Sequence, residues 1–205
     1  MCSRLQNRSR ILKVSLRQIR GPWDEGWVLD KHSVSSVYLG DDEHGHPQFN
    51  TTRTEVGEAT YQLKYRQDWA QAKPLAQAVV DNICPKFSKV GLIVPMPAST
   101  QRARQPVAEV AKELGTLMKL PVFCNLLVKA KNRKSLKDLS TKDEKIEAIG
   151  SSFSVNDEIS NNGQWNALVV DDLFHTGASM ETACKVLRMY PKIGKIYVVA
   201  LTWRS

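Results

Sequence analysis

The chain has 205 residues, and its 29 lysines and arginines against 21 aspartates and glutamates give a formal net charge of +8. This length can bury one full core, so one domain with an N-terminal elaboration is expected. No apolar run approaches the ~20 residues of a membrane span, and the arginine-rich start has no apolar signal core. These features exclude a membrane-spanning protein and predict a cytoplasmic one.

The positive charge is concentrated near the N-terminus. Residues 1–20 contain no acid and carry Arg4, Arg8, Arg10, Lys13, Arg17 and Arg20. Such an arm suits a polyanion, and it equally suits a sheet edge that basic side chains protect from pairing. Nucleic-acid binding through residues 1–20 is therefore one of two open alternatives.

Residues 11–60 are predicted to form short antiparallel strands, because apolar and polar side chains alternate between turn signals. The apolar positions are Leu12, Val14, Leu16, Val34, Val37 and Leu39. His44 and His46 lie in the turn at 40–47 with no third ligand nearby, so we expect a hairpin tip and no metal there. Residues 1–60 thus form a β-rich, basic N-terminal segment in this interpretation, and residues 61–205 form the main domain.

Residues 61–205 alternate predicted helices and strands. Helical spacing predicts one or two helices before Pro85, one over 107–118 and one that buries Met180, Ala183, Cys184 and Leu187. Apolar runs predict strands at 90–94, 122–128, 153–155, 165–170 and 196–201. This order predicts an α/β fold with a mostly parallel twisted sheet flanked by helices, whose ligands bind at the carboxyl ends of the strands.

The four cysteines are Cys2, Cys84, Cys124 and Cys184. No two lie close enough in sequence for a zinc knuckle or a redox dithiol. Three of them have apolar neighbours, so we expect buried thiols.

The loop after the strand at 90–94 is a candidate anion site. Pro95 and Pro97 stiffen it, and Arg102 and Arg104 follow at a spacing suited to neutralising an anion. The alternative is a rigid strand exit with two solvated arginines.

Residues 129–150 form a long polar stretch. Its cations are Lys129, Lys131, Arg133, Lys134, Lys137, Lys142 and Lys145. Long polar insertions in compact domains are either functional or linker-like. A mobile basic loop and a solvated linker with a short helix near 141–148 therefore both stay open.

Two adjacent carboxylates end the apolar run 168–170. Asp171 and Asp172 come where a buried strand is expected to end at Val170, and a small-residue turn over 176–179 then opens a helix. Adjacent acids can reach ribose hydroxyls, and the N–H groups of a helix N-terminus can hold a phosphate. A simple helix cap needs one polar side chain, whereas this turn has two acids, two hydroxyls and a glycine.

Residues 168–179 resemble the PRPP motif of type I phosphoribosyltransferases, which has four apolar residues, two acids, two apolar residues and a small Thr/Gly/Ser loop. His175 departs from it, because the family has a small residue there. The histidine can donate a ring N–H to a phosphate or point into solvent, and both alternatives stay open.

The resemblance implies a Mg²⁺-dependent transferase that moves the phosphoribosyl group of PRPP and releases pyrophosphate. The implied catalytic residues are Asp171, Asp172, Lys131 and Arg133, the two acids holding the ribose hydroxyls directly or through Mg²⁺. The implied phosphate-binding residues are His175, Thr176, Gly177, Ala178 and Ser179. The implied pyrophosphate loop comprises Pro97, Ala98, Ser99, Arg102 and Arg104, with the mobile basic loop closing over PRPP.

Three further stretches look like those of ComF-like proteins, which have the same fold and are linked to DNA uptake. They are Leu63-Lys64-Tyr65-Arg66, Pro95-x-Pro97 and Arg102-x-Arg104, and the similarity covers residues 60–203. The chain departs from that family in having no four-cysteine zinc ribbon and in having Gln105-Pro106 after the arginines.

Two functions therefore stay open. The first is a phosphoribosyltransferase that acts on PRPP. The second is a non-enzymatic, nucleotide-sensing or DNA-associated module in DNA uptake, processing or defence. An oligomer is compatible with either function, and the sequence leaves the acceptor base, the pathway and the role of residues 1–60 open.

Overall fold

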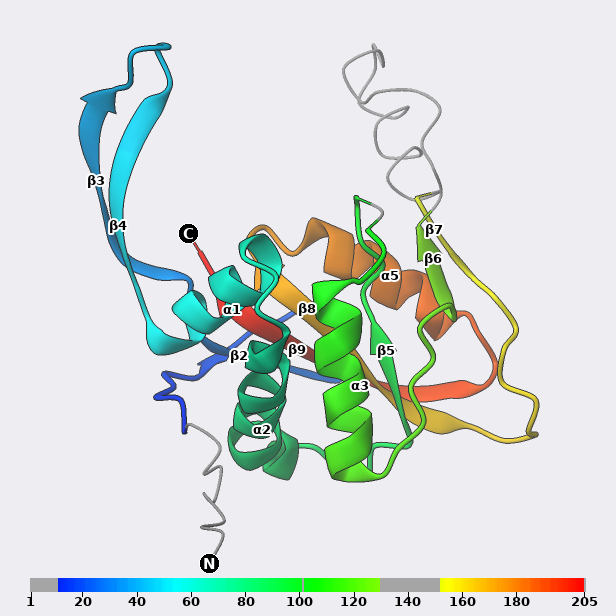
Figure 1. Cartoon of the computed structure of the whole chain (residues 1–205). Coiled ribbons are helices and arrows are strands. Elements are labelled where there is room, and N and C mark those ends of the chain that lie inside the picture. Colours follow the sequence, from blue (N-terminus) through cyan, green and yellow to red (C-terminus); the bar gives the residue numbers. More distant parts are fainter. Residues whose placement is uncertain (1–10, 101, 130–151, 205) are drawn as a thin grey trace, which may run out of the picture.

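The computed structural model describes residues 11–100, 102–129 and 152–204. At its centre is a five-stranded sheet in the order β1-β2-β9-β8-β5 (Figure 1). In that order the strands are β1 (Arg17–Gln18), β2 (Glu25–Lys31), β9 (Ile193–Trp203), β8 (Trp165–Phe174) and β5 (Leu92–Pro95). Neighbouring strands are parallel except β1 and β2. The predicted α/β fold with a mostly parallel sheet is confirmed.

Helices cover both faces of the sheet. On one face lie α1 (Glu55–Tyr65), α2 (Ala72–Asn82) and α3 (Pro106–Met118), and on the other lies α5 (Ala178–Arg188). The short 3-10 turns η1 (Trp69–Gln71) and η2 (Cys84–Lys86) flank α2. The helices predicted over 107–118 and around Met180 are confirmed, as are helices between residue 61 and Pro85. The prediction of β structure up to residue 60 was wrong at its end, because α1 begins at Glu55.

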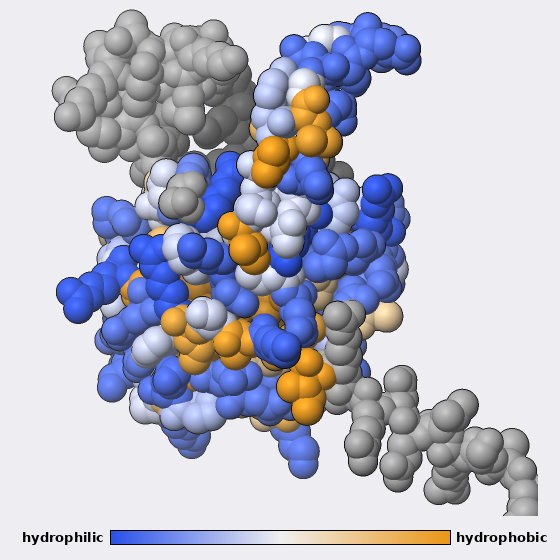
Figure 2. Space-filling model, turned by 90° about the vertical axis from the view of Figure 1, so that its left-hand side faces the viewer, coloured by the Kyte–Doolittle hydropathy of each residue, from blue (hydrophilic) through white to orange (hydrophobic). Residues whose placement is uncertain are grey.

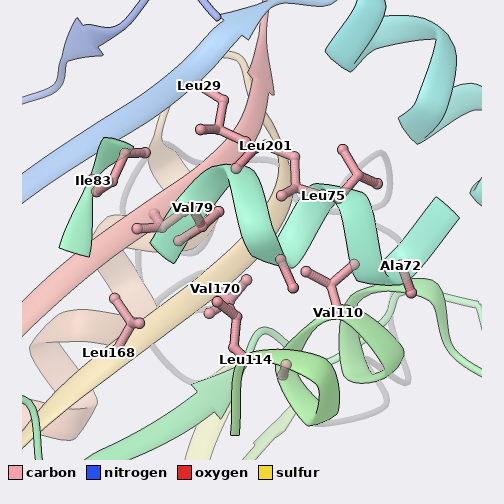
Figure 3. Packing of buried hydrophobic residues seen from close by; sticks show 14 of the residues in the cluster. Leu29, Ala72, Leu75, Val79, Ile83, Val110, Leu114, Leu168, Val170 and Leu201 are labelled. Carbon is pink, nitrogen blue, oxygen red and sulfur yellow. The ribbon is translucent and has the colours of Figure 1, made fainter. Parts of the chain in front are cut away.

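The core between the sheet and the first helix layer is continuous. Leu75 of α2 and Leu114 of α3 are fully buried and pack toward Leu168 and Val170 of β8 (Figure 3). Burying such a side chain is worth about 1.5–3 kcal/mol relative to leaving it exposed. This layer fixes the helices against the strands that carry the candidate site.

Helix α1 is held firmly to the end of β2. The Thr54 hydroxyl accepts from the backbone N–H of Gly57 at 3.0 Å and donates to the carbonyl oxygen of Lys31 at 2.6 Å. A side chain at Gly57 would meet the His32 carbonyl oxygen, since a Cβ there would lie 2.0 Å from it. The close approach requires glycine and holds the first turn of α1 against the chain just after β2.

The predicted antiparallel pairing of residues 11–60 is only partly correct. It holds for β1 with β2 and for the hairpin of β3 (Ser33–Asp41) and β4 (Pro47–Arg53). It is wrong for β2, which pairs in parallel with β9, so that Val28 meets Ala200. The full burial of Val28 and Leu29 explains the correction, because a parallel strand covered on both faces must be apolar.

Two predicted strand boundaries were wrong. Strand β8 does not end at Val170 but continues through both acids to Phe174, because β9 remains beside it and pairs Phe174 with Trp203. The predicted strand 122–128 is reduced to a single bridge between Val122 and Ile93, followed by β6 (Leu127–Lys129). Strand β6 pairs with β7 (Phe153–Val155) in a separate two-stranded sheet.

The predicted hairpin turn is present, and the predicted burial of the cysteines is only partly correct. His44 and His46 lie in the turn of the β3–β4 hairpin, and the described residues contain no group of three or more metal-ligating side chains. Cys184 is buried and Cys84 is partly buried, but Cys124 is exposed, so its predicted burial was wrong. Within the described ranges, no helix has both the length and the apolar character that crossing a membrane requires.

Candidate functional site

The candidate site lies at the carboxyl ends of β5 and β8. After β5 the chain enters α3 on one face of the sheet, and after β8 it enters α5 on the other face. A crevice forms where neighbouring parallel strands send their helices to opposite faces. A cavity of about 310 Å³ occurs there. It is lined by Lys64, Met96, Pro97, Ala98, Ser99, Thr100, Arg102, Gln105, Pro106, Val107, Lys129, Phe153, Asp171, Asp172, Leu173 and Ser179.

The two acids lie within β8, so their side chains leave opposite faces of the sheet. Strand alternation places Asp172 on the side of α1 and Asp171 on the side of α5, and both line the cavity. The backbone N–H of Asp172 donates to Oδ1 of Asp171 at 2.8 Å. The acids can therefore approach a ligand from two sides.

Lys64 of α1 forms an ion pair with Asp172. Its Nζ lies 2.5 Å from Oδ2 of Asp172, and both side chains are largely shielded from solvent. Burial alone would lower the pKa of Lys64, but the Asp172 carboxylate outweighs it, and the net pKa is raised. No role for Lys64 was expected from the local sequence. Its only signal was the Leu-Lys-Tyr stretch.

Asp171 titrates near neutrality. Burial, and next the negative charge of Asp172, raise the pKa of the Asp171 carboxyl from 3.8 to about 7. Lys64 acts in the opposite direction but does not cancel the shift. A carboxyl group with such a pKa can hold or release a proton at physiological pH, which is typical of a functional site.

The backbone of Asp172 is held in place by hydrogen bonds that involve Thr202 and His32. The Thr202 hydroxyl donates to the Asp172 carbonyl oxygen at 2.9 Å, and Nδ1 of His32 lies 3.2 Å from the same hydroxyl. Since that hydroxyl already donates its proton, the network assigns the donating proton to His32 Nδ1. Burial, together with Arg53 and Lys64, lowers the pKa of His32. Sequence patterns gave no signal for His32.

The proline loop contributes the opposite wall. Pro97, Ala98 and Ser99 line the same cavity as the two acids. Arg102 also lines it and donates from Nη1 to the Lys64 carbonyl oxygen at 2.7 Å. This bond joins two of the three stretches that look like those of ComF-like proteins.

Arg104 does not belong to this wall. Its Nε donates to Oε2 of Glu109 at 2.8 Å, and its guanidinium lies 4.4 Å from the centre of a Trp69 ring. Arg104 is absent from the cavity lining among the described residues. Its ion pair and ring contact anchor the loop to α3 and η1.

The basic stretch meets the loop at its first residue. Lys129 lines the cavity, and its Nζ donates to the Ser99 hydroxyl at 2.9 Å. The predicted catalytic residues Lys131 and Arg133 lie outside the described residues, as does the rest of the predicted mobile loop after Lys129.

The small-residue turn leads into α5. Gly177 is the N-cap at φ 80°, and a Cβ there would lie 2.9 Å from Cζ of Phe174. Ser179 in the first turn lines the cavity, whereas His175, Thr176 and Ala178 are exposed beside it and are not in its lining. The N–H of Ala178 donates to the Thr176 hydroxyl at 3.4 Å, and Ser179 brings the first turn of α5 to one end of the cavity.

No protein-family model matches the chain, and no curated protein matches it. Among solved structures, the chain is similar to the adenine phosphoribosyltransferase from Thermoanaerobacter pseudethanolicus, with 13% identity over 82% of this chain and 95% of that one and a TM-score of 0.45. It is also similar to the adenine phosphoribosyltransferase from Leishmania tarentolae, with 10% identity over 93% of this chain and 95% of that one and a TM-score of 0.46. A third similar structure is UMP synthase from Leishmania donovani, with 13% identity over 80% of this chain and a TM-score of 0.43. The match covers 27% of that protein, so the chain spans about a quarter of its length. The chemistry of the site rests on the residues of this chain.

Proposed function

We propose that the chain binds PRPP or a related ribose 5-phosphate and transfers its phosphoribosyl group with release of pyrophosphate. One observation carries this proposal. Asp171 and Asp172, the cations Lys64, Arg102 and Lys129, and the N-terminus of α5 all meet at one cavity. Carboxylates suit sugar hydroxyls, whereas cations and helix N–H groups suit phosphates.

The two carboxylates also fit a magnesium ion. Mg²⁺ prefers oxygen ligands and is held by one or two carboxylates together with substrate phosphates. Asp171 and Asp172 supply that donor set at the cavity wall. When bound, Mg²⁺ would neutralise negative charge on the pyrophosphate.

In this proposal, different residues of the chain hold the ribose, the 5′-phosphate and the pyrophosphate. Asp171 and Asp172 orient the ribose hydroxyls, and the N–H groups at the start of α5 hold the 5′-phosphate. Arg102, Lys129 and Ser99 stabilise the departing pyrophosphate. Because the reacting sugar carbon develops positive charge as pyrophosphate leaves, the nearby carboxylates favour that step electrostatically.

The finer assignment to ComF-like proteins is part of this proposal. It rests on the stretch at Lys64 and the loop at Arg102, which a hydrogen bond joins at the cavity wall. Both stretches therefore serve one site.

Isothermal titration with PRPP and Mg²⁺ tests ligand binding. We expect binding to the wild type and to Asp81→Asn, because Asp81 is an exposed acid on α2. Asp172→Asn should weaken binding by about tenfold or more, the loss of one charge-assisted contact. Absence of heat with the wild type, or equal binding by both variants, would contradict the proposal. Ribose 5-phosphate and pyrophosphate, titrated separately, show which half of the site each occupies.

A non-catalytic nucleotide sensor is the second candidate, and the Lys64–Asp172 ion pair favours it. A ligand that competes for Asp172 would release α1 from β8 and change the shape of the chain. Pyrophosphate release from PRPP in the presence of purine and pyrimidine bases separates the two candidates. Release identifies the transferase, whereas binding without release supports the sensor.

A DNA-associated form of this sensor draws on the basic residues 1–20, of which Lys13, Arg17 and Arg20 lie in the described part. Retention of single- and double-stranded DNA tests it with and without residues 1–10, because Leu12 and Ile19 are buried and must stay. Retention that falls steeply with salt and with the deletion supports DNA association.

A further inference from the structure

His32 lies at the junction between the central sheet and the β3–β4 hairpin. It directly follows β2, and its backbone N–H donates to the Trp203 carbonyl oxygen of β9 at 2.8 Å. The hairpin begins at the next residue and projects from the body (Figure 1). Figure 2 shows the same hairpin rising from the body of the molecule. The hydrogen bond to Trp203 therefore fixes the His32 backbone to the body.

The ring of His32 begins a chain of hydrogen bonds that ends at Asp172. Thr202 is fully buried, and its hydroxyl must donate to the Asp172 carbonyl oxygen, because a carbonyl oxygen can only accept. That hydroxyl has no second proton, so Nδ1 of His32, 3.2 Å away, supplies the N–H between them. Burial, with Arg53 and Lys64 next, lowers the pKa of His32. The ring is therefore neutral at neutral pH, and its one N–H is at Nδ1.

The bond to Asp172 falls where β8 has lost one of its neighbouring strands. Strand β5 ends at Pro95, which pairs with Val170, whereas β9 continues beside β8 to Phe174. Within the described residues, β8 therefore pairs with β9 alone where it carries Asp171 and Asp172. A strand held along one edge moves more readily than one held along both edges. An additional side-chain bond to its backbone therefore restricts the position of the carboxylates.

The backbone of His32 also contacts the helix that carries Lys64. Its carbonyl oxygen packs against Gly57 in the first turn of α1, and Lys64 lies about two turns further along the same helix. His32 thus contacts the helix of Lys64 and, through Thr202, the strand of Asp172. Lys64 and Asp172 form the ion pair at the cavity wall, so His32 helps to hold both partners in register.

We propose that His32 is a positioning residue that orients Asp172 for its ligand through the Thr202 hydroxyl. This role rests on the proposed function, because it concerns a ligand at Asp172. Among the described residues, His32 is not part of the cavity lining, so it acts through its neighbours and not by contact with the ligand. A ligand then meets a carboxylate that is already oriented, and binding does not include the cost of ordering it. Loss of the Nδ1–H group should lower affinity although no ligand contact is removed.

Heteronuclear NMR of the histidine ring nitrogens tests the direction of the hydrogen bonds without any ligand. We expect the Nδ1–H tautomer for His32 in the wild type, because the Thr202 hydroxyl requires a donor. Thr202→Val removes the hydroxyl at similar volume, and His32 should then shift toward the Nε2–H tautomer. His44 is exposed in the hairpin turn and should give the same signals in both proteins. An Nε2–H tautomer of His32 in the wild type would overturn the proposed role.

Calorimetric titration with PRPP and Mg²⁺ tests the effect on the ligand. His32→Leu and Thr202→Val should each weaken binding by about fivefold, the equivalent of one hydrogen bond. The double variant should bind no more weakly than either single variant, because both changes interrupt the same chain of bonds. His32→Asn, whose side-chain amide supplies a similar N–H, should bind within about twofold of the wild type. His44→Leu makes the same change at an exposed histidine and should leave binding unchanged.

The possible outcomes separate this role from the proposed function. Equal binding by the wild type and His32→Leu, or losses that add in the double variant, overturn the positioning role alone. A loss in His32→Leu that His32→Asn does not restore also overturns it, because the ring would then matter for packing and not for its N–H. A wild type that binds no PRPP contradicts the proposed function and this role together. Circular dichroism confirms that all variants are folded.

Discussion

The Nζ of Lys64 lies 2.5 Å from Oδ2 of Asp172, and this contact ties α1 to β8 near its carboxyl end. It connects the first helix to the strand that carries both acids. Any ligand that occupies Asp172 must therefore share the carboxylate with Lys64 or displace it. The ion pair therefore affects both the stability of the fold and the binding of a ligand at Asp172.

Breaking this ion pair should destabilise the fold. Lys64→Gln leaves a shielded carboxylate without its partner, and we expect the free energy of unfolding to fall by about 1–2 kcal/mol, between the values for exposed and fully buried pairs. Urea denaturation measures the change. Lys112→Gln breaks the more exposed pair of Lys112 with Glu109 and should cost about 0.5 kcal/mol or less. Equal losses in the two variants would contradict the assignment.

Asp171 should make the free energy of unfolding depend on pH. Its folded-state pKa of about 7 lies above its ordinary value of 3.8, so the folded protein binds more protons between these pH values. Its contribution to stability is present at low pH and is lost as the pH rises through this window. Asp171→Asn should become more stable relative to the wild type as the pH rises from about 5 to about 8, as measured by urea denaturation. Parallel pH profiles would contradict the raised pKa.

Deprotonation of Asp171 should also govern ligand binding. Only the carboxylate can accept from ribose hydroxyls at both oxygens or bind Mg²⁺, so affinity for PRPP with Mg²⁺ should rise as the pH increases toward 8. Calorimetric titration at several pH values measures this rise. Asp171→Asn should bind weakly and lose the pH dependence. A wild-type affinity that does not change with pH would argue against a contact with Asp171.

The two arginines of the proline loop should behave differently. Arg102→Gln removes a cation from the cavity and should weaken pyrophosphate binding by about tenfold. Arg104→Gln should leave binding within about twofold, and it should cost about 1 kcal/mol of stability, since it loses the Glu109 pair and the Trp69 contact. Calorimetry and urea denaturation separate the effects. The reverse assignment would make Arg104 the ligand-binding residue.

Gly177→Ala should impair both folding and phosphate binding. The new methyl group would meet the Phe174 ring in a left-handed backbone, and we expect a loss of about 1–3 kcal/mol. Gly45→Ala is the control for backbone strain alone, because it has φ 76° with open space around its Cβ. It should cost about 1 kcal/mol and leave binding unchanged. Thermal shift with ribose 5-phosphate measures both properties, and unchanged binding by Gly177→Ala would contradict the proposed phosphate turn.

Local patterns were sufficient for most helices and for the position of the acids. The spacing of Met180, Ala183, Cys184 and Leu187 predicted the inner face of α5, because a helix must bury one stripe of side chains. Asp171 and Pro95 were predicted to lie at strand ends; Pro95 ends β5, whereas β8 continues past Asp171, which lines the cavity. Periodicity and the geometry of parallel sheets carry this information.

Contacts between distant segments were not predictable in the same way. The strand through Asp171 and Asp172 continues because β9 lies beside it, and nothing within those residues records that partner. The role of Lys64 depends on where α1 packs against β8. Arg102 and Arg104 look equivalent in sequence, but the position of Glu109 on α3 turns one away. Each result depends on tertiary packing, which overrides local preference.

The parallel pairing of β2 with β9 also constrains when the protein can fold. Residues 25–31 are synthesised early, whereas their partners at 193–203 leave the ribosome near the end of synthesis. Until then, β2 has only the short strand β1 beside it and lacks β9 on its other edge, and pairing across such a separation is slow. We therefore expect the nascent chain to depend on chaperones, and a chain truncated before β9 to aggregate, since its central sheet lacks the strand that joins its two halves.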